Sequence, residues 1–359
     1  MNRREFLVAA GAAPLALRTE AGPSKVQARP ERWTKPRHFI WTQPDPKANS
    51  PVLKQQYETL RKRGLHGVFL YGQDDREVEA IREAGLDAHI WIQTTNRGDA
   101  WIREHHPDWY MVSRSGKSCF DKPPYIASYR WVSPVIPGVQ RYLAEEVDRI
   151  ASLPAVSGVH LDYVRYPDVI LPKGLWSRYG LVQNEELPDY DFCYSAHTRE
   201  AFRRESGRDP MEIADPAHDR EWLHFRYDSV SRLVDALAKA TRKHRKQITA
   251  AVFPTPRLAR KICRQDWGGW PLDFAAPMLY HGYYEEPVEW VGDCVLEDIQ
   301  AARFPIIAGL HMPQMKSPEE FGRGLEAARK NGASGVCLFG GVAEKDWRQF
   351  EEFAARWKG

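Results

Sequence analysis

One carboxylate in the chain stands directly after a short apolar run. Residues 156–167 read VSGVHLDYVRYP, and Asp162 follows the apolar residues 159–161. A short apolar run bounded by turn residues is typical of a buried parallel strand. An acid at the carboxyl end of such a strand faces the space above the sheet. Asp162 is therefore the first candidate for a catalytic group.

The residues near Asp162 predict opposite effects on its pKa. Arg165 and, from the following helical segment, Arg226 could keep the acid ionised, because a nearby positive charge lowers a carboxyl pKa. Burial beside Tyr163 and Tyr166 would raise that pKa. The sequence leaves both outcomes open. It also leaves open that Asp162 is structural and holds Arg165 or a backbone turn.

Eight strand-like runs recur along the chain, and helical patterns separate most of them. Ser50 and Pro51 are expected to start the first helix as N-cap and first helical residue. The strand runs are residues 38–42, 67–71, 88–93, the run before Asp162, 248–253, 274–280, 305–310 and 336–339. The helical patterns are residues 50–63, 75–84, 138–151, 195–205, 222–244, 256–263 and 345–357.

This alternation predicts an α/β fold, a (β/α)₈ TIM barrel with long loops after the third and fourth strands. Residues 37–359 are expected to form this single domain. An open doubly wound sheet is the alternative, but it would need a glycine-rich turn after the first strand. The turn here reads WTQPDPKANSP and has no such pattern.

Active sites of such barrels lie at the carboxyl ends of the strands. The residues there are mostly aromatic or amide-bearing, which suits a neutral polyhydroxylated ligand. They are Trp41, Gln43, Tyr71, Gln73, Asp74, Asp75, Gln93, Asn96, Asp162, Tyr163, Arg165, Tyr166, Phe253, Tyr280, His281, Tyr283, Tyr284, His311, Gln314 and Phe339.

Composition narrows the class of ligand. The 51 basic and 48 acidic residues nearly balance, which argues against nucleic acid or a membrane surface as partner. The 13 Trp and 15 Tyr are compatible with sugar stacking, or with ordinary core packing. No spacing of His, Cys or carboxylates makes a convincing metal site, so neither metal nor cofactor is expected. The five cysteines form no CxxC pair, and few or no disulfides are expected.

The chain begins MNRREFLVAAGAAPLAL, with a twin arginine before a short stretch of small apolar residues. This pattern resembles a bacterial twin-arginine export signal. It predicts a cleaved signal over residues 1–21, a linker over residues 22–36 and a periplasmic or secreted protein. A disordered basic start is the alternative. No later segment is long and apolar enough to span a membrane.

Several stretches together resemble the bacterial glycosyl-hydrolase-like barrels that carry an LDY(I/V)RYP fourth strand, which stand near the α-amylase and chitinase barrels. The stretches are HPDW at 106–109, Gly116, Ser133, Pro134, VQRYL at 139–143, GVHLDYVRYP at 158–167, Trp222, Arg226, Val230, QDW at 265–267 and DFAAPMLY at 273–280. The resemblance runs from about residue 105 to residue 284. It implies a TIM-type barrel, glycoside hydrolysis and a carbohydrate substrate, without saying which glycan.

Glycoside hydrolysis usually needs two carboxylates. Asp162 fills one role, but the fifth strand lacks the Glu that α-amylase-like barrels place there. Asp266 is the preferred second acid, although its QDW turn suits a helix N-cap equally well. The other candidates are Asp74, Asp75, Asp189, Asp191 and Glu285.

Substrate assistance is a further hypothesis, because Met278-Leu279-Tyr280 is similar to the chitinase M-x-Y motif and would give Tyr280 a catalytic role. The expected substrate-binding residues are Trp41, Trp131, Tyr163, Arg165, Tyr166, Trp176, Arg226, His281, Tyr283, Tyr284 and His311. A glycan-binding barrel without turnover remains the alternative function. A metal-dependent hydrolase or aldolase is a third.

Overall fold

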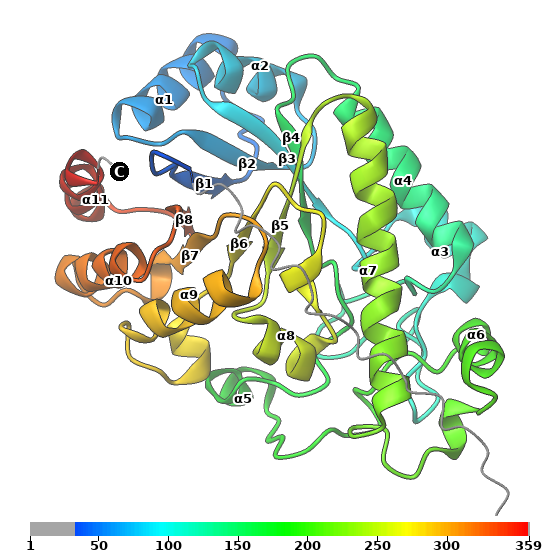
Figure 1. The fold of residues 1–359 in the computed structure, drawn as a ribbon. Coiled ribbons are helices and arrows are strands. Elements are labelled where there is room, and N and C mark those ends of the chain that lie inside the picture. Colours follow the sequence, from blue (N-terminus) through cyan, green and yellow to red (C-terminus); the bar gives the residue numbers. More distant parts are fainter. Residues whose placement is uncertain (1–32, 358–359) are drawn as a thin grey trace, which may run out of the picture.

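The computed structural model describes residues 33–357, which fold around eight parallel strands. Adjacent strands follow the order β6-β5-β4-β3-β2-β1-β8-β7. Their bounds are β1 Phe39–Thr42, β2 Gly67–Tyr71, β3 Asp87–Gln93, β4 Gly158–Asp162, β5 Gln247–Val252, β6 Phe274–Pro277, β7 Ile307–His311 and β8 Gly335–Phe339. Figure 1 shows the strands inside a ring of helices.

Two parallel bridges join the ends of this order. Ala275 pairs with Ile306, and Met278 pairs with Gly309, so β6 lies against β7 and the sheet closes. The predicted (β/α)₈ barrel is therefore confirmed, and the open doubly wound sheet is excluded. The sixth strand is shorter than predicted, because regular pairing with β5 ends at Pro277.

Alternation along the strands divides the core into two layers. Inside the barrel, Phe39, Trp41, Phe69 and Trp91 pack with residues from β5 to β8. The alternate apolar strand residues, such as Ile40, Val68 and Ile90, pack outward against the helices. Asp162 is two residues beyond the interior His160, so it belongs to the inward-facing set at the carboxyl end of β4.

Eleven α-helices occur in the described residues. They are α1 Ser50–Lys62, α2 Asp75–Glu83, α3 Ala100–His105, α4 Pro137–Ala151, α5 Trp176–Tyr179, α6 Ala196–Ser206, α7 Arg220–Lys243, α8 Pro256–Cys263, α9 Trp290–Ala301, α10 Pro318–Lys330 and α11 Glu344–Arg356. The seven predicted helices are present within about two residues, and α3, α5, α9 and α10 are additional. The N-cap of α1 is Asn49 rather than Ser50, because Asn49 accepts a hydrogen bond from Val52 N.

Long connections follow β3 and β4, as predicted, and carry the short helices α3, α5 and α6 (Figure 1).

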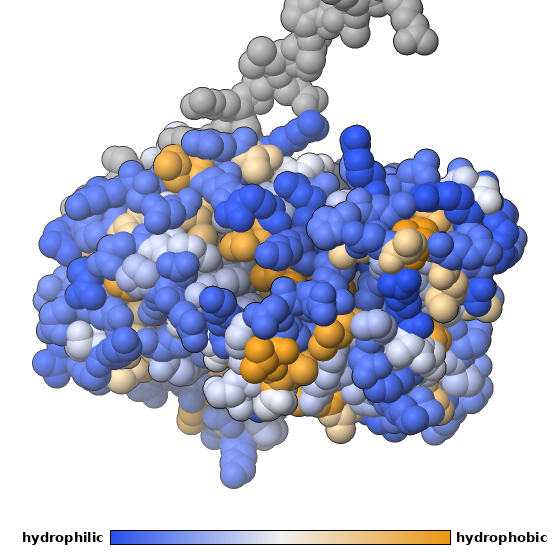
Figure 2. All heavy atoms as spheres, turned by 90° about the horizontal axis from the view of Figure 1, so that it is seen from below, coloured by the Kyte–Doolittle hydropathy of each residue, from blue (hydrophilic) through white to orange (hydrophobic). Residues whose placement is uncertain are grey.

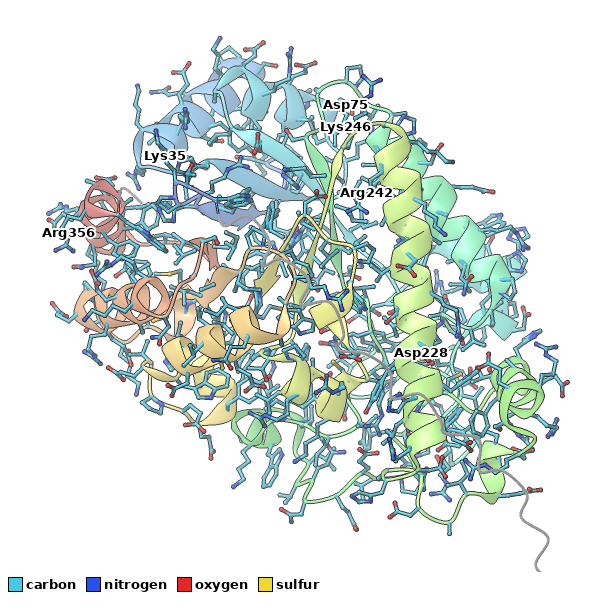
Figure 3. The ribbon with its side chains drawn as sticks, in the orientation of Figure 1. Lys35, Asp75, Asp228, Arg242, Lys246 and Arg356 are labelled. Carbon is cyan, nitrogen blue, oxygen red and sulfur yellow. The ribbon has the colours of Figure 1, made fainter. Side chains whose placement is uncertain are left out.

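Charged side chains such as Lys35, Asp228 and Arg356 are exposed on the outer surface (Figure 3). The face seen in Figure 2 is mostly hydrophilic, with several small apolar patches. Between residues 33 and 357, no helix has the length and hydropathy of a membrane span. The predicted signal and most of the predicted linker lie outside the described residues.

Candidate active site

A cavity of about 530 Å³ lies at the carboxyl ends of the strands. Its floor comes from residues at the ends of β1 to β6 and β8, including Trp41, Trp91 and Asp162. One wall comes from the connection after β4, with Leu171, Pro172 and α5. The cavity therefore occupies the place where barrel enzymes bind their substrates, and its size is that of a ligand pocket.

Asp162 is held at this floor by two hydrogen bonds. Trp91 Nε1 donates to Asp162 Oδ2 at 2.9 Å, and the backbone N–H of Tyr163 donates to Oδ1 at 2.6 Å. The side chain is 7% exposed and lines the cavity. The two donors fix the orientation of the carboxyl group, and the exposed fraction of the residue opens into the cavity.

Burial raises the pKa of Asp162 to about 6, although both donors and the charge of Arg165 act to lower it. Desolvation therefore outweighs the combined effect of these groups. At pH 7 such a carboxyl group is protonated about one tenth of the time, and more often in mildly acidic solution. A carboxyl group of this kind can donate a proton to a leaving group.

The backbone at Tyr163 has a strained conformation that orients its N–H toward the carboxylate of Asp162. Tyr163 has φ of 51°, in the left-handed region that a non-glycine residue rarely adopts. The carbonyl of Tyr163 is fixed by Thr95, whose N–H and hydroxyl both donate to it. This turn directs the Tyr163 N–H at the preceding carboxylate. Strained residues of this type gather at functional sites.

Asp168 is the second carboxylate of the cavity, and it is not among the acids predicted from the sequence. It lies six residues beyond Asp162, is 7% exposed and lines the same cavity. Its Oδ2 lies 3.4 Å from Nη1 of Arg165. Burial raises the pKa of Asp168, and the adjacent guanidinium opposes this. In the sequence, Asp168 directly follows the YVRYP stretch at 163–167. Only this position close to Asp162 could have marked it as a candidate.

Arg165 is buried between aromatic rings beside both acids. Its guanidinium carbon lies 4.6 Å from the ring centroid of Phe253, 4.8 Å from that of Trp131 and 5.3 Å from that of Tyr163. Nη1 donates to the carbonyl of Tyr166 at 2.9 Å. Arg165 thus supplies a fixed positive charge in the cavity wall.

Four of the expected substrate-binding aromatics line the cavity, Trp41, Tyr163, Tyr283 and Tyr284, and so does Tyr280, the expected catalytic tyrosine. Burial and the charge of Asp162 raise the pKa of Tyr280, so its phenol stays protonated and can donate a hydrogen bond. The ring of Tyr280 stacks on Phe339, which closes the floor at β8.

Other expected substrate-binding residues lie elsewhere. Trp131 and Tyr166 are fully buried, and Tyr166 bonds Ser229 at 2.9 Å instead of facing a ligand. Trp131 packs beneath Arg165, so neither residue can offer a ring face to a sugar. Trp176 donates to the carbonyl of Leu171 and supports the wall from outside.

Neither expected histidine lines the cavity. His311 packs behind Tyr280, with ring centroids 4.9 Å apart. His281 is 4% exposed, and its Nε2 lies 4.0 Å from a carboxylate oxygen of Glu320. Burial lowers the pKa of both imidazoles, so both are neutral at pH 7. Both rings are packing groups behind the site.

Asp266, the preferred second acid, does not reach the cavity. Its carboxylate pairs with Arg260 at 2.8 Å and is 42% exposed. It stands at the N-cap position of the turn Trp267–Gly269 but makes no capping hydrogen bond. The other acids considered are also absent from the cavity lining: Asp74 caps α2, Asp189 pairs with Lys117, Asp191 pairs with Arg226, and Asp75 and Glu285 are exposed.

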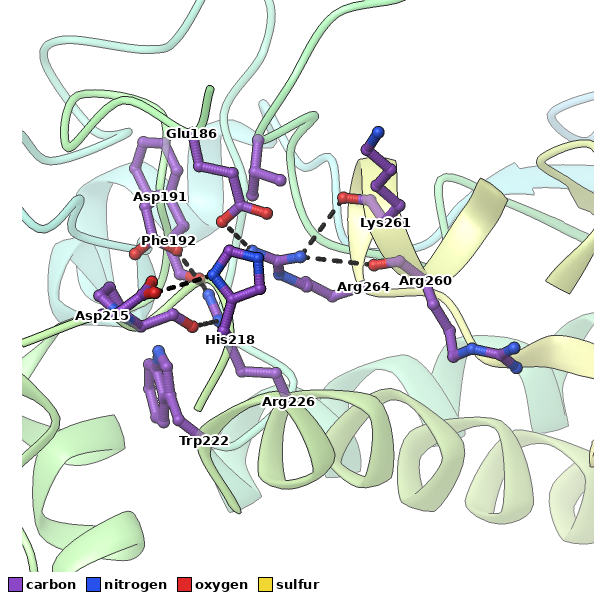
Figure 4. Close-up of polar contacts among 12 residues, drawn as sticks. Glu186, Asp191, Phe192, Asp215, His218, Trp222, Arg226, Arg260, Lys261 and Arg264 are labelled. Carbon is purple, nitrogen blue, oxygen red and sulfur yellow. Dashed lines mark hydrogen bonds and ion pairs between the residues drawn. The ribbon is translucent and has the colours of Figure 1, made fainter. Parts of the chain in front are cut away.

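Arg226 anchors the long connection after β4 and does not approach Asp162. Its Nη1 lies 2.5 Å from Asp191 Oδ1, and the guanidinium covers the ring of Trp222 at 4.7 Å (Figure 4). Beside it, Arg264 pairs with Glu186 from the same connection (Figure 4). These two buried ion pairs hold the segment that carries the cavity wall against α7 and α8.

Within residues 33–357, no group of three or more His, Cys, Asp or Glu side chains is placed to hold a metal ion. The polar groups described above in the cavity lining are two buried carboxyl groups, a guanidinium and phenols. Acid–base or nucleophilic catalysis on a polyhydroxylated ligand is compatible with this set.

No protein-family model and no curated protein sequence matches the chain. Several solved protein structures do match the chain. The glycoside hydrolase domain of PgaB (BpsB) from Bordetella bronchiseptica is 13% identical with a TM-score of 0.64, covering 89% of this chain and 97% of that one. The catalytic domain of a β-amylase from Paenibacillus polymyxa is 14% identical with a TM-score of 0.61, covering 90% and 99%.

A β-galactosidase from the psychrophilic Marinomonas ef1 is 11% identical with a TM-score of 0.60, covering 89% of this chain and 59% of that one. At such identities the similarity shows the fold alone. The class defined by fold and site is therefore a (β/α)₈ barrel whose structural neighbours are glycoside hydrolases.

Proposed function

We propose that the protein is a glycoside hydrolase that acts on an oligo- or polysaccharide. The observation that carries this proposal is Asp162, a buried carboxyl group with a pKa near 6 at the floor of an aromatic cavity. A glycosidic oxygen must be protonated as it leaves, and a carboxyl group with a raised pKa is the usual donor. The glycoside hydrolases among the structural neighbours support the proposal at the level of fold.

Asp162 acts as the general acid in this proposal. Its raised pKa keeps the proton available near neutrality, and Trp91 and Tyr163 N–H orient the carboxyl group. Asp168 is the partner that activates water or attacks the sugar carbon. Burial raises the pKa of Asp168, and the charge of Arg165 opposes this shift and so supports the ionised form that either role requires. This replaces Asp266 as the second carboxylate.

The first experiment compares the wild type with Asp162→Asn on the polysaccharide and on aryl glycosides of the sugar that the wild type releases. Loss of a general acid lowers kcat by about 10²- to 10⁴-fold. The loss should be much smaller on a 2,4-dinitrophenyl glycoside, because this leaving group departs without a proton. Equal losses on both substrates would argue against the general-acid role.

Asp168→Asn is the companion variant. If Asp168 is the base or nucleophile, the variant should lose activity on both leaving groups. Addition of azide should restore turnover in part, because the anion can replace the missing carboxylate. The anomer formed first by the wild type, followed by NMR, then distinguishes the two roles: retention indicates a nucleophile and inversion a base.

A glycan-binding protein without turnover is the second candidate. It is favoured by the absence of any Glu among the cavity-lining residues and by the ion pair that occupies Asp168. In that case wild type and Asp162→Asn bind the same glycan and neither releases a product. An active wild type together with an inactive variant that still binds would exclude it.

The proposal includes export through the twin-arginine route, on the strength of Arg3 and Arg4 before a short apolar stretch. Replacing both arginines with lysine should keep the protein in the cytoplasm at its full precursor mass. Fractionation of expressing cells with antibody detection tests this. A periplasmic product from the double-lysine variant would contradict the proposed route.

A further inference from the structure

A smaller cavity of about 260 Å³ adjoins the catalytic cavity. Tyr71, Trp91 and Gln93 line both, so the two spaces meet at these three side chains. The smaller one is below the size of an ordinary ligand pocket and suits one part of a larger ligand. Its junction lies close to the proposed acid, because Gln93 pairs in register with Asp162 across β3 and β4.

The amide of Gln93 has a defined orientation at this junction. The backbone N–H of Arg130 can only donate, and it donates to Asn96 Oδ1 at 3.0 Å. Asn96 Nδ2 therefore points the other way and donates to Gln93 Oε1 at 3.2 Å. The Nε2 of Gln93 makes no hydrogen bond within residues 33–357, which leaves it as a donor for a ligand.

The floor of the smaller cavity carries an excess of carboxylates. Arg97 is 7% exposed and pairs with Asp99 at 2.7 Å and with Glu146 at 3.0 Å. It also donates to the carbonyl of Gln93 at 2.8 Å. The Asp99 and Glu146 side chains keep 31% and 22% of their surface exposed. Because one guanidinium faces two carboxylates, these side chains carry a net negative charge. This charge favours hydroxyl or amino groups of a ligand and disfavours anions.

We propose that the smaller cavity is a subsite for the sugar unit next to the one that Asp162 releases. Gln93 Nε2 donates a hydrogen bond to an oxygen of that unit, and Asn96 is the positioning residue that keeps the donor turned toward it. The unit is neutral or amino-substituted, and uronic acids or sulfated sugars are rejected there. The release of a sugar unit in this inference rests on the proposed function. The binding of the neighbouring unit does not depend on it.

The test uses a printed array of neutral, N-acetylated, amino and uronic oligosaccharides of one to six units. It is probed with the wild type and with Asp162→Asn, and affinities of the positive series are measured by calorimetry. Affinity should rise by about tenfold when the chain becomes long enough to enter the subsite, and uronic members should gain nothing. Equal affinity for all lengths would overturn the subsite.

Three variants identify the residues. Gln93→Leu should remove about fivefold of the gain in affinity for long chains, the typical effect of one neutral hydrogen bond, and should weaken binding of the shortest bound chain less than this. Asn96→Asp keeps the bond to Arg130 N–H but turns the Gln93 amide around, so it should act in the same direction. Glu146→Gln should let uronic chains bind several-fold better. Gln55→Glu, on the exposed face of α1, is the matched control and should change nothing.

The outcomes separate the subsite from the catalytic proposal. Binding that depends on chain length and on Gln93, without product formation, supports the subsite and contradicts hydrolysis. Hydrolysis that is indifferent to chain length and to Gln93→Leu supports hydrolysis and contradicts the subsite. Equal loss of short- and long-chain binding in Gln93→Leu also contradicts the subsite. An array on which neither protein binds contradicts both.

Discussion

Asp162 should make the stability of the protein depend on pH in a particular direction. Its folded-state pKa of about 6 lies above the ordinary 3.8, so the folded state holds the proton more tightly than the unfolded state. The contribution of this group to stability is then fully present below about pH 3.8 and falls as pH rises through 6. Between pH 4.5 and 7.5 the fall is about 2 kcal/mol.

Asp162→Asn removes this titration. The free energy of unfolding of the variant, relative to the wild type, should therefore rise by about 2 kcal/mol between pH 4.5 and 7.5. Urea unfolding at the two pH values measures the difference. Asp168 is present in both proteins, so the effect of its titration largely cancels in this comparison. A relative stability that stays constant or falls over this range would show that the pKa of Asp162 is not raised.

Trp91 should set the upper pH limit of activity. Its Nε1–H stabilises the ionised form of Asp162 and so lowers the pKa of this acid against the effect of burial. Trp91→Phe keeps an aromatic ring but removes the donor, so the basic limb of kcat/KM should move upward by up to about one pH unit. A pH–rate profile measures the shift, and a limb that moves downward would contradict the assignment.

At the scale of elements, one of the two buried ion pairs that hold the connection after β4 can be tested by itself. Arg226 on α7 is fully buried and holds Asp191 and the carbonyl of Phe192, at 2.5 and 3.1 Å. Breaking a buried pair by removing one partner costs about 3–5 kcal/mol, because the remaining charge is left uncompensated. Arg226→Met should therefore lower the free energy of unfolding by that amount.

Arg232→Met is the matched control on the same helix. Arg232 lies 3.8 Å from Glu205, and both side chains are about half exposed, so its loss should cost less than about 1 kcal/mol. Chemical unfolding of the two variants measures the contrast. Similar losses in both would mean that the Arg226 pair does not anchor the connection.

The sequence predicted the elements better than the positions of residues on loops. The eight apolar runs could be read because a buried parallel strand needs nearly continuous apolar residues. Helix α10 was missed although Ser317, Pro318 and Glu320 give it a regular N-cap, with Ser317 accepting from Glu320 N. Helix α9 starts at Trp290, and its N-cap residue Glu289 makes no side-chain capping hydrogen bond, so its start has no such pattern.

The residues of the candidate site also fall into those near strand ends, which could be predicted, and those on loops, which could not. Asp162, Trp41 and Tyr280 could be assigned because each lies near the end of a strand, and the barrel brings those ends together. Asp168 could not, because its place in the cavity depends on how the connection after β4 folds back. Trp131 lies on the other long connection, where a large aromatic residue can pack beneath the loop as easily as face a ligand.

At the scale of the whole molecule, the five cysteines bear on where the protein works. Cys119, Cys193, Cys263, Cys294 and Cys337 are all buried and all free. Burial raises the pKa of the Cys263 thiol, which holds it in the unreactive protonated form. A chain that folds before it crosses a membrane would carry such thiols already shielded into an oxidising compartment.

If the protein is exported as proposed, the exported protein should titrate no thiols with Ellman's reagent while folded, and five after denaturation without reductant. The Arg226→Met variant gives a second measurement, because a less stable fold exposes thiols through more frequent opening. Its labelling should be faster than that of the wild type at the same pH, and Arg232→Met should label like the wild type. Fewer than five thiols after denaturation would mean that the exported protein is oxidised, and that its thiols are not shielded before it reaches that compartment.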